Sequence, residues 1–227
     1  MSRRADDVRW ERATVYDVVA LAVLAALLVP VVARTVAAGA HGAELATALL
    51  LGVLAADFLT GCLHWLADTC FSEDTPLLGP AVIAPFRLHH RDPLAMTRQS
   101  FLRVSHSNVV ATSAMLAAFW GWRGADAAPS PFADAWIASL ACALWLTNQI
   151  HQWAHVAHPP RPVAWLHASG LILTPARHAQ HHAAGHDRAY CVTTGWLNPL
   201  LDRAGVFAAA ARVVHALQRP RALDSTR

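Results

Sequence analysis

The sequence predicts an all-α fold, a polytopic membrane bundle of about four transmembrane helices. Hydrophobic residues make up 55% of the 227 residues and charged residues only 15%, where a soluble domain carries about 25% charged residues. Four apolar segments each approach the roughly 20 residues that a helix needs to cross a bilayer. Because no internal repeat or low-complexity linker divides the chain, we expect residues 1–227 to form one integral-membrane domain.

The four apolar segments follow one another with short or polar connections. They cover about residues 14–33, 43–67, 104–122 and 133–150. The basic start before the first segment is also typical of a signal peptide, but the apolar run is longer than a signal peptide needs, which favours an uncleaved anchor. A shorter apolar stretch, 163–173, predicts an interfacial or buried helix, and 206–217 predicts a surface helix.

Arginine supplies all 18 basic residues, and there is no lysine. This excludes lysine-dependent chemistry such as a P-loop or a pyridoxal Schiff base. With four spans, only Arg34 and Arg123 fall in the outer loops, so the positive-inside rule places both termini on the cytoplasmic side. The abundance of Ala and Arg favours a high-GC bacterium and hence an inner membrane. A net charge of +3 without a basic stripe argues against nucleic acid.

The cysteines form no CxxC pair. Cys62, Cys70, Cys142 and Cys191 are well separated, and two of them lie in apolar runs. We therefore expect reduced structural thiols rather than a disulfide framework or a thiolate metal site.

Histidine is the anomalous residue, with 14 copies. Under the four-span topology, segments far apart in the sequence bring imidazoles to one cytoplasmic face. His151 and His155 are one helical turn apart, and His178 has the same relation to His181 and His182. Neutral imidazole binds Fe, Zn and Cu. The clustered set predicts two metal ions with about four nitrogen ligands each: His64, His89, His90, His151, His155, His178, His181 and His182.

Other metal chemistries fit this pattern less well. Zinc hydrolysis needs a general base beside a histidine pair, but there is no HExxH, and none of Glu11, Glu44 and Glu73 is suitably placed. Haem ligands usually come one per helix from within the spans, and adjacent pairs such as His89 and His90 are then not needed. Di-iron oxygen chemistry explains the surplus of histidines best.

Four sequence blocks carry a family resemblance. They are DFLTGCLHWLADT (57–69), PFRLHHRDPLAMTR (85–98), TNQIHQWAH (147–155) and LILTPARHAQHH (171–182), the last followed by His186, Tyr190 and 195–198. In this order, over about residues 55–202, they resemble the Kua/CarF-type lipid desaturases, which include plasmanylethanolamine desaturase. The plant plastid branch of the same family desaturates an acyl chain of phosphatidylglycerol.

The resemblance implies a membrane oxidoreductase with two Fe ions that uses O2 to desaturate a membrane phospholipid. The first expectation for its reaction is formation of the vinyl ether bond of plasmalogens from plasmanyl phospholipids. Desaturation of a phospholipid acyl chain and a fatty-acid-hydroxylase-type reaction are alternatives. A membrane haem- or metal-binding protein is the non-enzymatic alternative.

Further residues are expected around the metal ions, as additional ligands or as groups that orient them. These residues are His106, His186, Asp68, Asn148 and Asp57. The sequence departs from the plasmalogen branch at Gln99, where that branch has a histidine. His106 lies seven residues later, on the same helical face, and is the candidate to replace the missing ligand.

The substrate and the electrons are both expected to come from outside the chain. Arg87, Arg91, Arg98 and Arg177 lie near the expected head-group plane and are candidates to bind a lipid phosphate. The sequence has no GxGxxG, flavin motif or iron–sulfur cysteine cluster. A separate donor, cytochrome b5-like or a ferredoxin, must therefore supply electrons at the cytoplasmic face.

Overall fold

The computed structural model describes residues 11–39, 41–124, 127–183 and 185–218. The first basic residues, Arg3 to Arg9, and the last residues of the chain lie outside them. Four long helices form a bundle: α1 (Val15–Ala37), α2 (Gly42–Thr69), α4 (Phe101–Arg123) and α5 (Pro131–Ala154). They cover the four apolar segments, and the described residues contain one isolated β-bridge but no strand. The all-α fold is thus confirmed.

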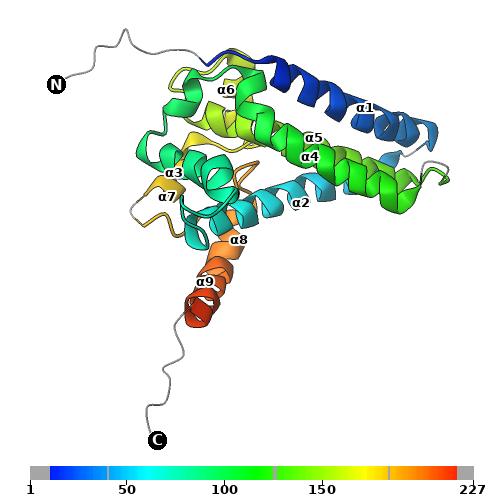
Figure 1. Cartoon of the computed structure of the whole chain (residues 1–227). Coiled ribbons are helices and arrows are strands. Elements are labelled where there is room, and N and C mark those ends of the chain that lie inside the picture. The colour runs from blue at the N-terminus through cyan, green and yellow to red at the C-terminus, as the bar shows by residue number, and fades with distance from the viewer. Residues whose placement is uncertain (1–10, 40, 125–126, 184, 219–227) are drawn as a thin grey trace, which may run out of the picture.

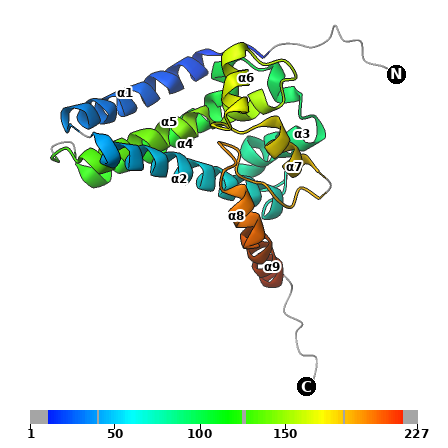
Figure 2. The ribbon, with the colours of Figure 1, turned by 180° about the vertical axis from the view of Figure 1, so that it is seen from behind.

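Helix α5 is the centre of the bundle, because it packs against α1, α2 and α4. Helices α1 and α4 also pack together, whereas α1 and α2 share hardly any contact and lie on either side of α5 (Figures 1 and 2). The apolar core of the bundle is built from α1, α4 and α5, with Leu24, Val31, Leu116 and Leu140 buried. Between α1 and α2, part of the surface of α5 is therefore not covered by either helix.

Local sequence signals explain where the long helices begin and end. Thr14 and Asp17 form a capping box at the start of α1, and the Ser100 hydroxyl caps α4. Pro131 opens α5, a position where its missing N–H costs nothing. Gly124 follows α4 with a φ of +79°, a conformation that glycine adopts readily.

Among the residues that the structure describes, two helices, α1 and α2, are long and apolar enough to cross a membrane by length and composition. Both carry exposed apolar side chains along their length, among them Val19, Val29 and Leu50. Helices α4 and α5 are of similar length but contain more polar residues. The count of four spans therefore stays a prediction.

Short helices gather at one end of the bundle (Figure 1). They are a π-helical turn, η2 (Gly79–Ile83), a 3-10 turn, η3 (Ala95–Arg98), and five α-helices: α3 (Ala84–Arg91), α6 (Arg161–Ala168), α7 (Pro175–His182), α8 (Asn198–Arg203) and α9 (Val206–Gln218). The surface helix expected near 206–217 is present as α9. The helix expected at 163–173 ends earlier, at Ala168, because a turn at Gly170 with a φ of +68° follows it.

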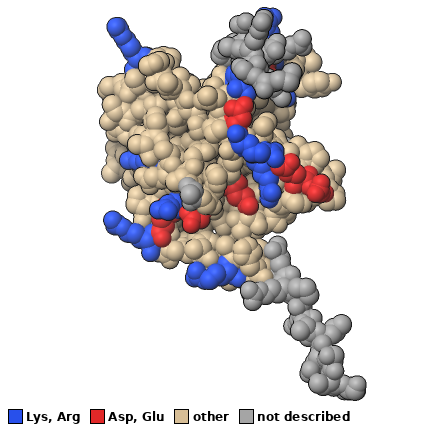
Figure 3. All heavy atoms as spheres, turned by 90° about the vertical axis from the view of Figure 1, so that its left-hand side faces the viewer, with Lys and Arg blue, Asp and Glu red and all other residues tan. Residues whose placement is uncertain are grey.

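Charged side chains gather at the same end (Figure 3). Several of them pair with one another, as Arg91 does with Glu73 and Arg98 with Asp92. All four cysteines are free, which confirms the expectation of unpaired thiols.

Candidate metal centre

The histidines from four helices meet at the end of the bundle that carries the short helices, in two adjacent groups. We call the first the five-histidine group: His89, His151, His155, His178 and His182. We call the second the aspartate group: His64, Asp68, His90 and His181. Within each group, the candidate ligand atoms all lie within 4.8 Å of one another. The structure thus brings together all eight histidines that the sequence singled out, together with Asp68, which was expected as an additional ligand or as a group that orients one.

The five-histidine group is centred on His178. Its Nε2 lies 2.8 Å from the Nε2 atoms of His151 and His155, and 2.9 Å from that of His182. The Nε2 of His182 in turn lies 3.0 Å from that of His89. A neutral imidazole has one N–H and one lone pair, so the Nε2 of His178 cannot satisfy three nitrogen neighbours by hydrogen bonds. Converging lone pairs of this kind are the donor set of a metal cation.

The aspartate group surrounds a buried carboxylate. The Nε2 atoms of His64, His181 and His90 lie 3.5, 3.6 and 3.7 Å from Oδ2 of Asp68. Both oxygens of Asp68 are buried, and neither has a hydrogen-bond donor. A buried carboxylate without a partner is strongly destabilising. A cation among the four side chains would bind both the carboxylate and the imidazole lone pairs, so these residues fit a metal ion.

The imidazoles of the short helices are held in the neutral form. Burial, reinforced by the neighbouring imidazoles, lowers the pKa of His89 to about 2 and that of His90 to about 3. Burial is also the main cause that lowers the pKa of His181 to about 4. Near neutral pH each of these rings is therefore a neutral imidazole with one nitrogen lone pair, as a metal ligand requires.

The two groups touch along a shared boundary. The ring centroids of His64 and His151 are 6.2 Å apart, those of His178 and His181 are 6.1 Å apart, and those of His89 and His90 are 5.8 Å apart. Two ions bound in these groups would be neighbours. The geometry therefore suits chemistry in which two metal ions act on one small molecule.

A carbonyl fixes the ring of His181. Its Nδ1 lies 2.8 Å from the backbone oxygen of Arg188, so that nitrogen carries the proton and donates it. The Nε2 lone pair is then directed at the aspartate group. The loop that follows α7 thus orients a ligand of the centre.

Among the other expected ligands, Asp57 has a different role. Its carboxylate is fully buried and accepts hydrogen bonds from the backbone N–H groups of Thr194 (2.7 Å), Gly195 (2.9 Å) and Leu197 (3.3 Å). Asp57 belongs to neither group, so the expectation that it is a metal ligand is corrected. Asp57 anchors the 194–197 turn to α2.

His106 and Asn148 also serve the bundle rather than the centre. The Nδ1 of His106 lies 2.7 Å from Oδ1 of the buried Asp17, and His106 belongs to neither group. The Nδ2 of Asn148 donates to the Val104 carbonyl (3.1 Å) and to the Ser107 hydroxyl (3.2 Å). The idea that His106 replaces a ligand at Gln99 is wrong, because His106 pairs α4 with the start of α1.

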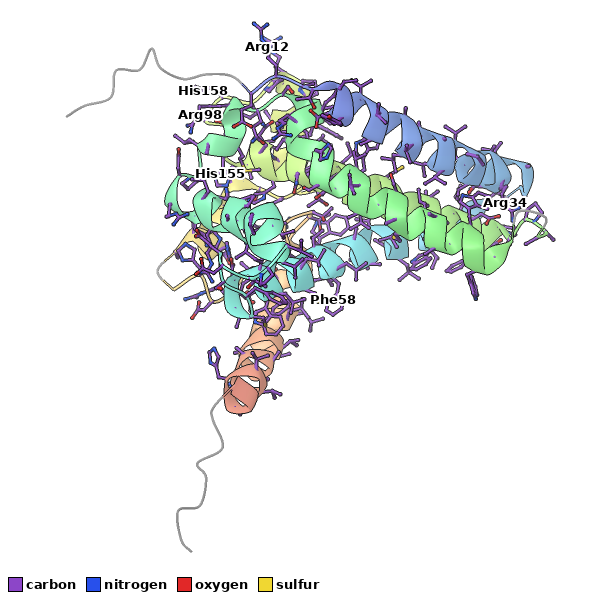
Figure 4. The ribbon with its side chains drawn as sticks, viewed as in Figure 1. Arg12, Arg34, Phe58, Arg98, His155 and His158 are labelled. Carbon is purple, nitrogen blue, oxygen red and sulfur yellow. The ribbon has the colours of Figure 1, made fainter. Side chains whose placement is uncertain are left out.

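His186 lies at the edge of the centre. Its ring stacks on that of His90, with centroids 4.3 Å apart and an interplanar angle of 9°. It is a member of neither group. His158, just beyond α5, is exposed, and Figure 4 labels it together with His155, which belongs to the five-histidine group. His186, which was expected as an additional ligand or as a group that orients one, thus stacks on a ligand without belonging to either group.

The four arginines expected at a lipid head group divide into two pairs. Arg98 is paired with Asp92 at 2.7 Å, and Arg177 donates to the carbonyls of Gly170 and Thr194. Arg87 and Arg91 line a cleft of about 640 Å³, in which Arg87 donates to the Phe71 carbonyl and Arg91 pairs with Glu73. That cleft also contains Asp68 and His90, so it leads from the surface to the aspartate group.

The sequence analysis gave no role at the centre to two sets of residues that lie near it. Tyr190 is buried, and its ring lies 5.2 Å from that of His181; burial raises the pKa of its hydroxyl to about 12. Thr193 is hydrogen-bonded to Thr147 at 2.8 Å and to Thr60 at 3.2 Å. The spacing of Thr60 before His64 and of Thr147 before His151, four residues each, was a signal that could have found the threonines.

Comparison with known proteins gives consistent matches. The chain is 37% identical to a plasmanylethanolamine desaturase of Myxococcus xanthus, over 75% of this chain and 60% of that protein. It is 36% identical to plasmanylethanolamine desaturase 1 of Mus musculus, over 78% of this chain and 68% of that protein. It is 31% identical to a chloroplastic fatty acid desaturase 4 of Arabidopsis thaliana, over 76% of this chain and 52% of that protein.

The chain thus spans between half and about two thirds of the length of these relatives. No solved structure matches it. Residues 53–223, which include both ligand groups, match the family model of the lipid desaturase domain. The chain belongs to the lipid desaturase domain family.

Proposed function

We propose that the protein is a di-iron, O2-dependent membrane lipid desaturase that forms the vinyl ether bond of plasmalogens from plasmanyl phospholipids. The observation that carries this proposal is the pair of adjacent ligand groups, which together contain eight histidines and one aspartate. Membership of the lipid desaturase family supports the reaction class. The plasmanylethanolamine desaturases of Myxococcus and mouse support the choice of lipid.

Iron suits the donor set better than other metals do. The groups offer nitrogen and carboxylate oxygen and no thiolate, a combination common to iron sites that handle O2. Two bound irons would supply the oxidising power that removal of hydrogen from an unactivated C–H bond needs. The five-histidine group would hold one ion, and the aspartate group would hold the other.

The reaction balances with one molecule of O2. Two hydrogen atoms leave the adjacent carbons next to the ether oxygen, and a carbon–carbon double bond forms between those carbons. O2 takes up these hydrogens, two electrons and two protons, and is reduced to two molecules of water. The two electrons come from an external donor, cytochrome b5-like or a ferredoxin, which would approach the end of the molecule where the histidines lie.

The chain's own residues hold and shield this chemistry. His64, His151 and His178 are almost completely buried, so these three ligands are shielded from bulk water. The Arg188 carbonyl keeps His181 in the tautomer that binds metal. Arg87 and Arg91, in the cleft beside the aspartate group, are the arginines placed to meet a phosphate of the substrate.

We also propose where the protein resides and how it is oriented in the membrane. Residues 1–227 form one domain with four spans in the inner membrane of a bacterium, with both termini and the metal centre on the cytoplasmic side. The arginine bias of the sequence supports this orientation. The exposed apolar surface of α1 and α2 supports insertion.

A second candidate is desaturation of a phospholipid acyl chain. The plant relative named fatty acid desaturase 4 favours it, as does Gln99, which departs from the plasmalogen branch. The Gln99 side chain bonds to Glu11 at 2.8 Å rather than to either ligand group. The two candidates differ in the bond made, because only the vinyl ether is cleaved by mild acid.

The test combines metal analysis with lipid mass spectrometry. We expect about two irons per purified chain and, in cells that express the protein and make plasmanyl lipids, a product two hydrogens lighter that mild acid cleaves. The variants His151→Ala and His181→Ala should abolish the product, whereas the exposed His158→Ala should not. Zinc without iron, normal turnover in both ligand variants, or a gain of one oxygen would each contradict the proposal.

A further inference from the structure

A long apolar cavity runs along α5 in the space between α1 and α2. We call it the α1–α2 groove; its volume is about 470 Å³. Its floor is one face of α5, from Ala135 through Cys142 to Ile150. Its walls include Val36 of α1 and Leu49 of α2. It exists because α1 and α2 each pack on or beside α5 and hardly touch one another.

The groove opens sideways onto the apolar surface of the bundle. Of the residues that line it, Val36 is 76% exposed, and Val32 and Leu49 are each 42% exposed. No charged side chain lines it. In a membrane this opening would face lipid hydrocarbon rather than water, so an apolar molecule can enter without crossing a polar layer.

The inner end of the groove reaches the metal centre. Ile150, which lines the groove, directly precedes His151 of the five-histidine group. Thr193 also lines the groove, and its hydroxyl bonds to Thr147 and Thr60. These two threonines lie one helical turn before His151 and His64. The groove therefore ends about one turn from a histidine of each group.

We propose that the α1–α2 groove binds the hydrocarbon chain that the enzyme desaturates, with the reacting carbons beside Thr193 and the methyl end toward Ala135 and Val36. This inference rests on the proposed function. From Ala135 to Ile150 the floor extends for about 22 Å along the helix axis. That exceeds the roughly 15 Å of one leaflet's hydrocarbon layer, so a long lipid chain fits.

Small side chains on α5 make room for the chain. Ala138, Ser139, Cys142 and Ala143 lie in succession along the floor. Cys142 and Ala143 are partly exposed and line the groove, so a larger side chain at either position would take up space in it. These two positions therefore set how long a chain the groove accepts.

The first test is the chain-length preference of Ala143→Phe and Cys142→Phe. Product from long chains should fall on the order of tenfold relative to product from short chains, with iron content unchanged. The matched control is Val110→Phe, because Val110 is an apolar residue of α4, 50% exposed, that does not line the groove. An unchanged preference in folded, iron-loaded variants of both positions would overturn the inference.

The second test does not depend on turnover. A plasmanyl phosphatidylethanolamine with a diazirine near the end of its ether chain is placed in vesicles with the protein, irradiated and mapped by mass spectrometry. Label should concentrate on groove residues near Ala135 and Val36, and Ala143→Phe should remove it while leaving label on the outer face of α4. Equal label on both faces, unaffected by Ala143→Phe, would overturn the inference.

The two tests separate this inference from the proposed function. Label in the groove of a protein that forms no desaturated lipid would contradict the function and support the groove as a chain site. Product formed with an unchanged chain preference and without groove label would support the function and contradict the groove.

Discussion

Each of the two His-His dipeptides divides its members between the two ligand groups. His89 belongs to the five-histidine group and His90 to the aspartate group, while His182 and His181 divide in the same way. Consecutive residues on a helix point about 100° apart, so one dipeptide can serve two neighbouring ions. This explains why the sequence needs adjacent histidines, which a single metal ion would not require.

The division predicts that the two histidines of a pair are not equivalent. His90→Ala should lower iron content from about two to about one per chain, because it removes a ligand of the aspartate group alone. His89→Ala should remove iron from the other group. Elemental analysis of both variants checks the stoichiometry, and spectroscopy of the remaining iron should differ between them. Identical spectra would contradict the assignment, and His158→Ala serves as the unaffected control.

The contacts of Asp57 predict that its substitution lowers the stability of the fold and leaves the metal bound. Asp57→Asn replaces one acceptor oxygen by an amide that faces buried backbone N–H groups, which should cost about 1–3 kcal/mol. Thermal unfolding in detergent should show a lower Tm with iron still bound. Asp92→Asn, at a half-exposed position paired with Arg98, should leave the Tm close to that of the parent. Loss of iron at an unchanged Tm would return Asp57 to the set of ligands.

Among the elements, helices α2 and α5 approach each other unusually closely at Gly52, because glycine has no Cβ to keep them apart. A Cβ built at Gly52 would lie 2.7 Å from Ser139 Cβ and 2.7 Å from the Trp136 carbonyl oxygen. These helices carry His64 and His151, one from each ligand group. Their close approach therefore fixes the relative position of the two groups.

Gly52→Ala should consequently damage the centre from a distance. The backbone of α5 cannot move away locally, so the helices must separate, with lower stability and weaker iron retention. Gly121→Ala is the matched control on α4, since a Cβ there meets nothing within 4 Å. It should be neutral or raise the Tm, because alanine favours helix over glycine. Equal behaviour of the two variants in thermal unfolding and iron analysis would contradict this account.

The sequence predicts elements better than it predicts contacts. Apolar runs indicated the four long helices, and helical spacing indicated the histidines of α5 and α7, because both signals are local. His64, His89 and His90 were instead indicated by the four-span topology, which brings distant segments to one face. The roles of Asp57 and His106 depend on partners at Thr194 and Asp17, far away in the chain. A buried carboxylate in an apolar run looks the same in sequence whether it binds metal or backbone, so only the packed structure distinguishes the two.

For the whole molecule, the ligands connect two short helices to the bundle, with which those helices otherwise share few contacts. They come from α2, α3, α5 and α7, and α3 and α7 are short helices with limited apolar burial of their own. Bound metal would therefore act as a cross-link between the short helices and the bundle. The stability of this end of the molecule should depend on metal more than that of the four-helix core does.

Removing metal with a chelator should loosen the short helices selectively. Hydrogen exchange should accelerate over α3 and α7, while the buried middle parts of α1, α4 and α5 stay protected by their apolar packing. Mass spectrometry of exchanged peptides, with and without chelator, checks this. Reloading with Fe²⁺ should restore protection, and uniform acceleration along the chain would argue for a centre that supports the whole fold.

The α1–α2 groove opens sideways, so the substrate reaches the enzyme from within the bilayer. A lipid that enters there never passes through water, so encounters occur by diffusion within the plane of the bilayer. The quantity that sets the rate is then the mole fraction of substrate among the lipids, not its amount per volume of solution. Diluting the bilayer with inert lipid at constant total substrate should slow the reaction, while diluting the vesicles in buffer should leave turnover per enzyme unchanged.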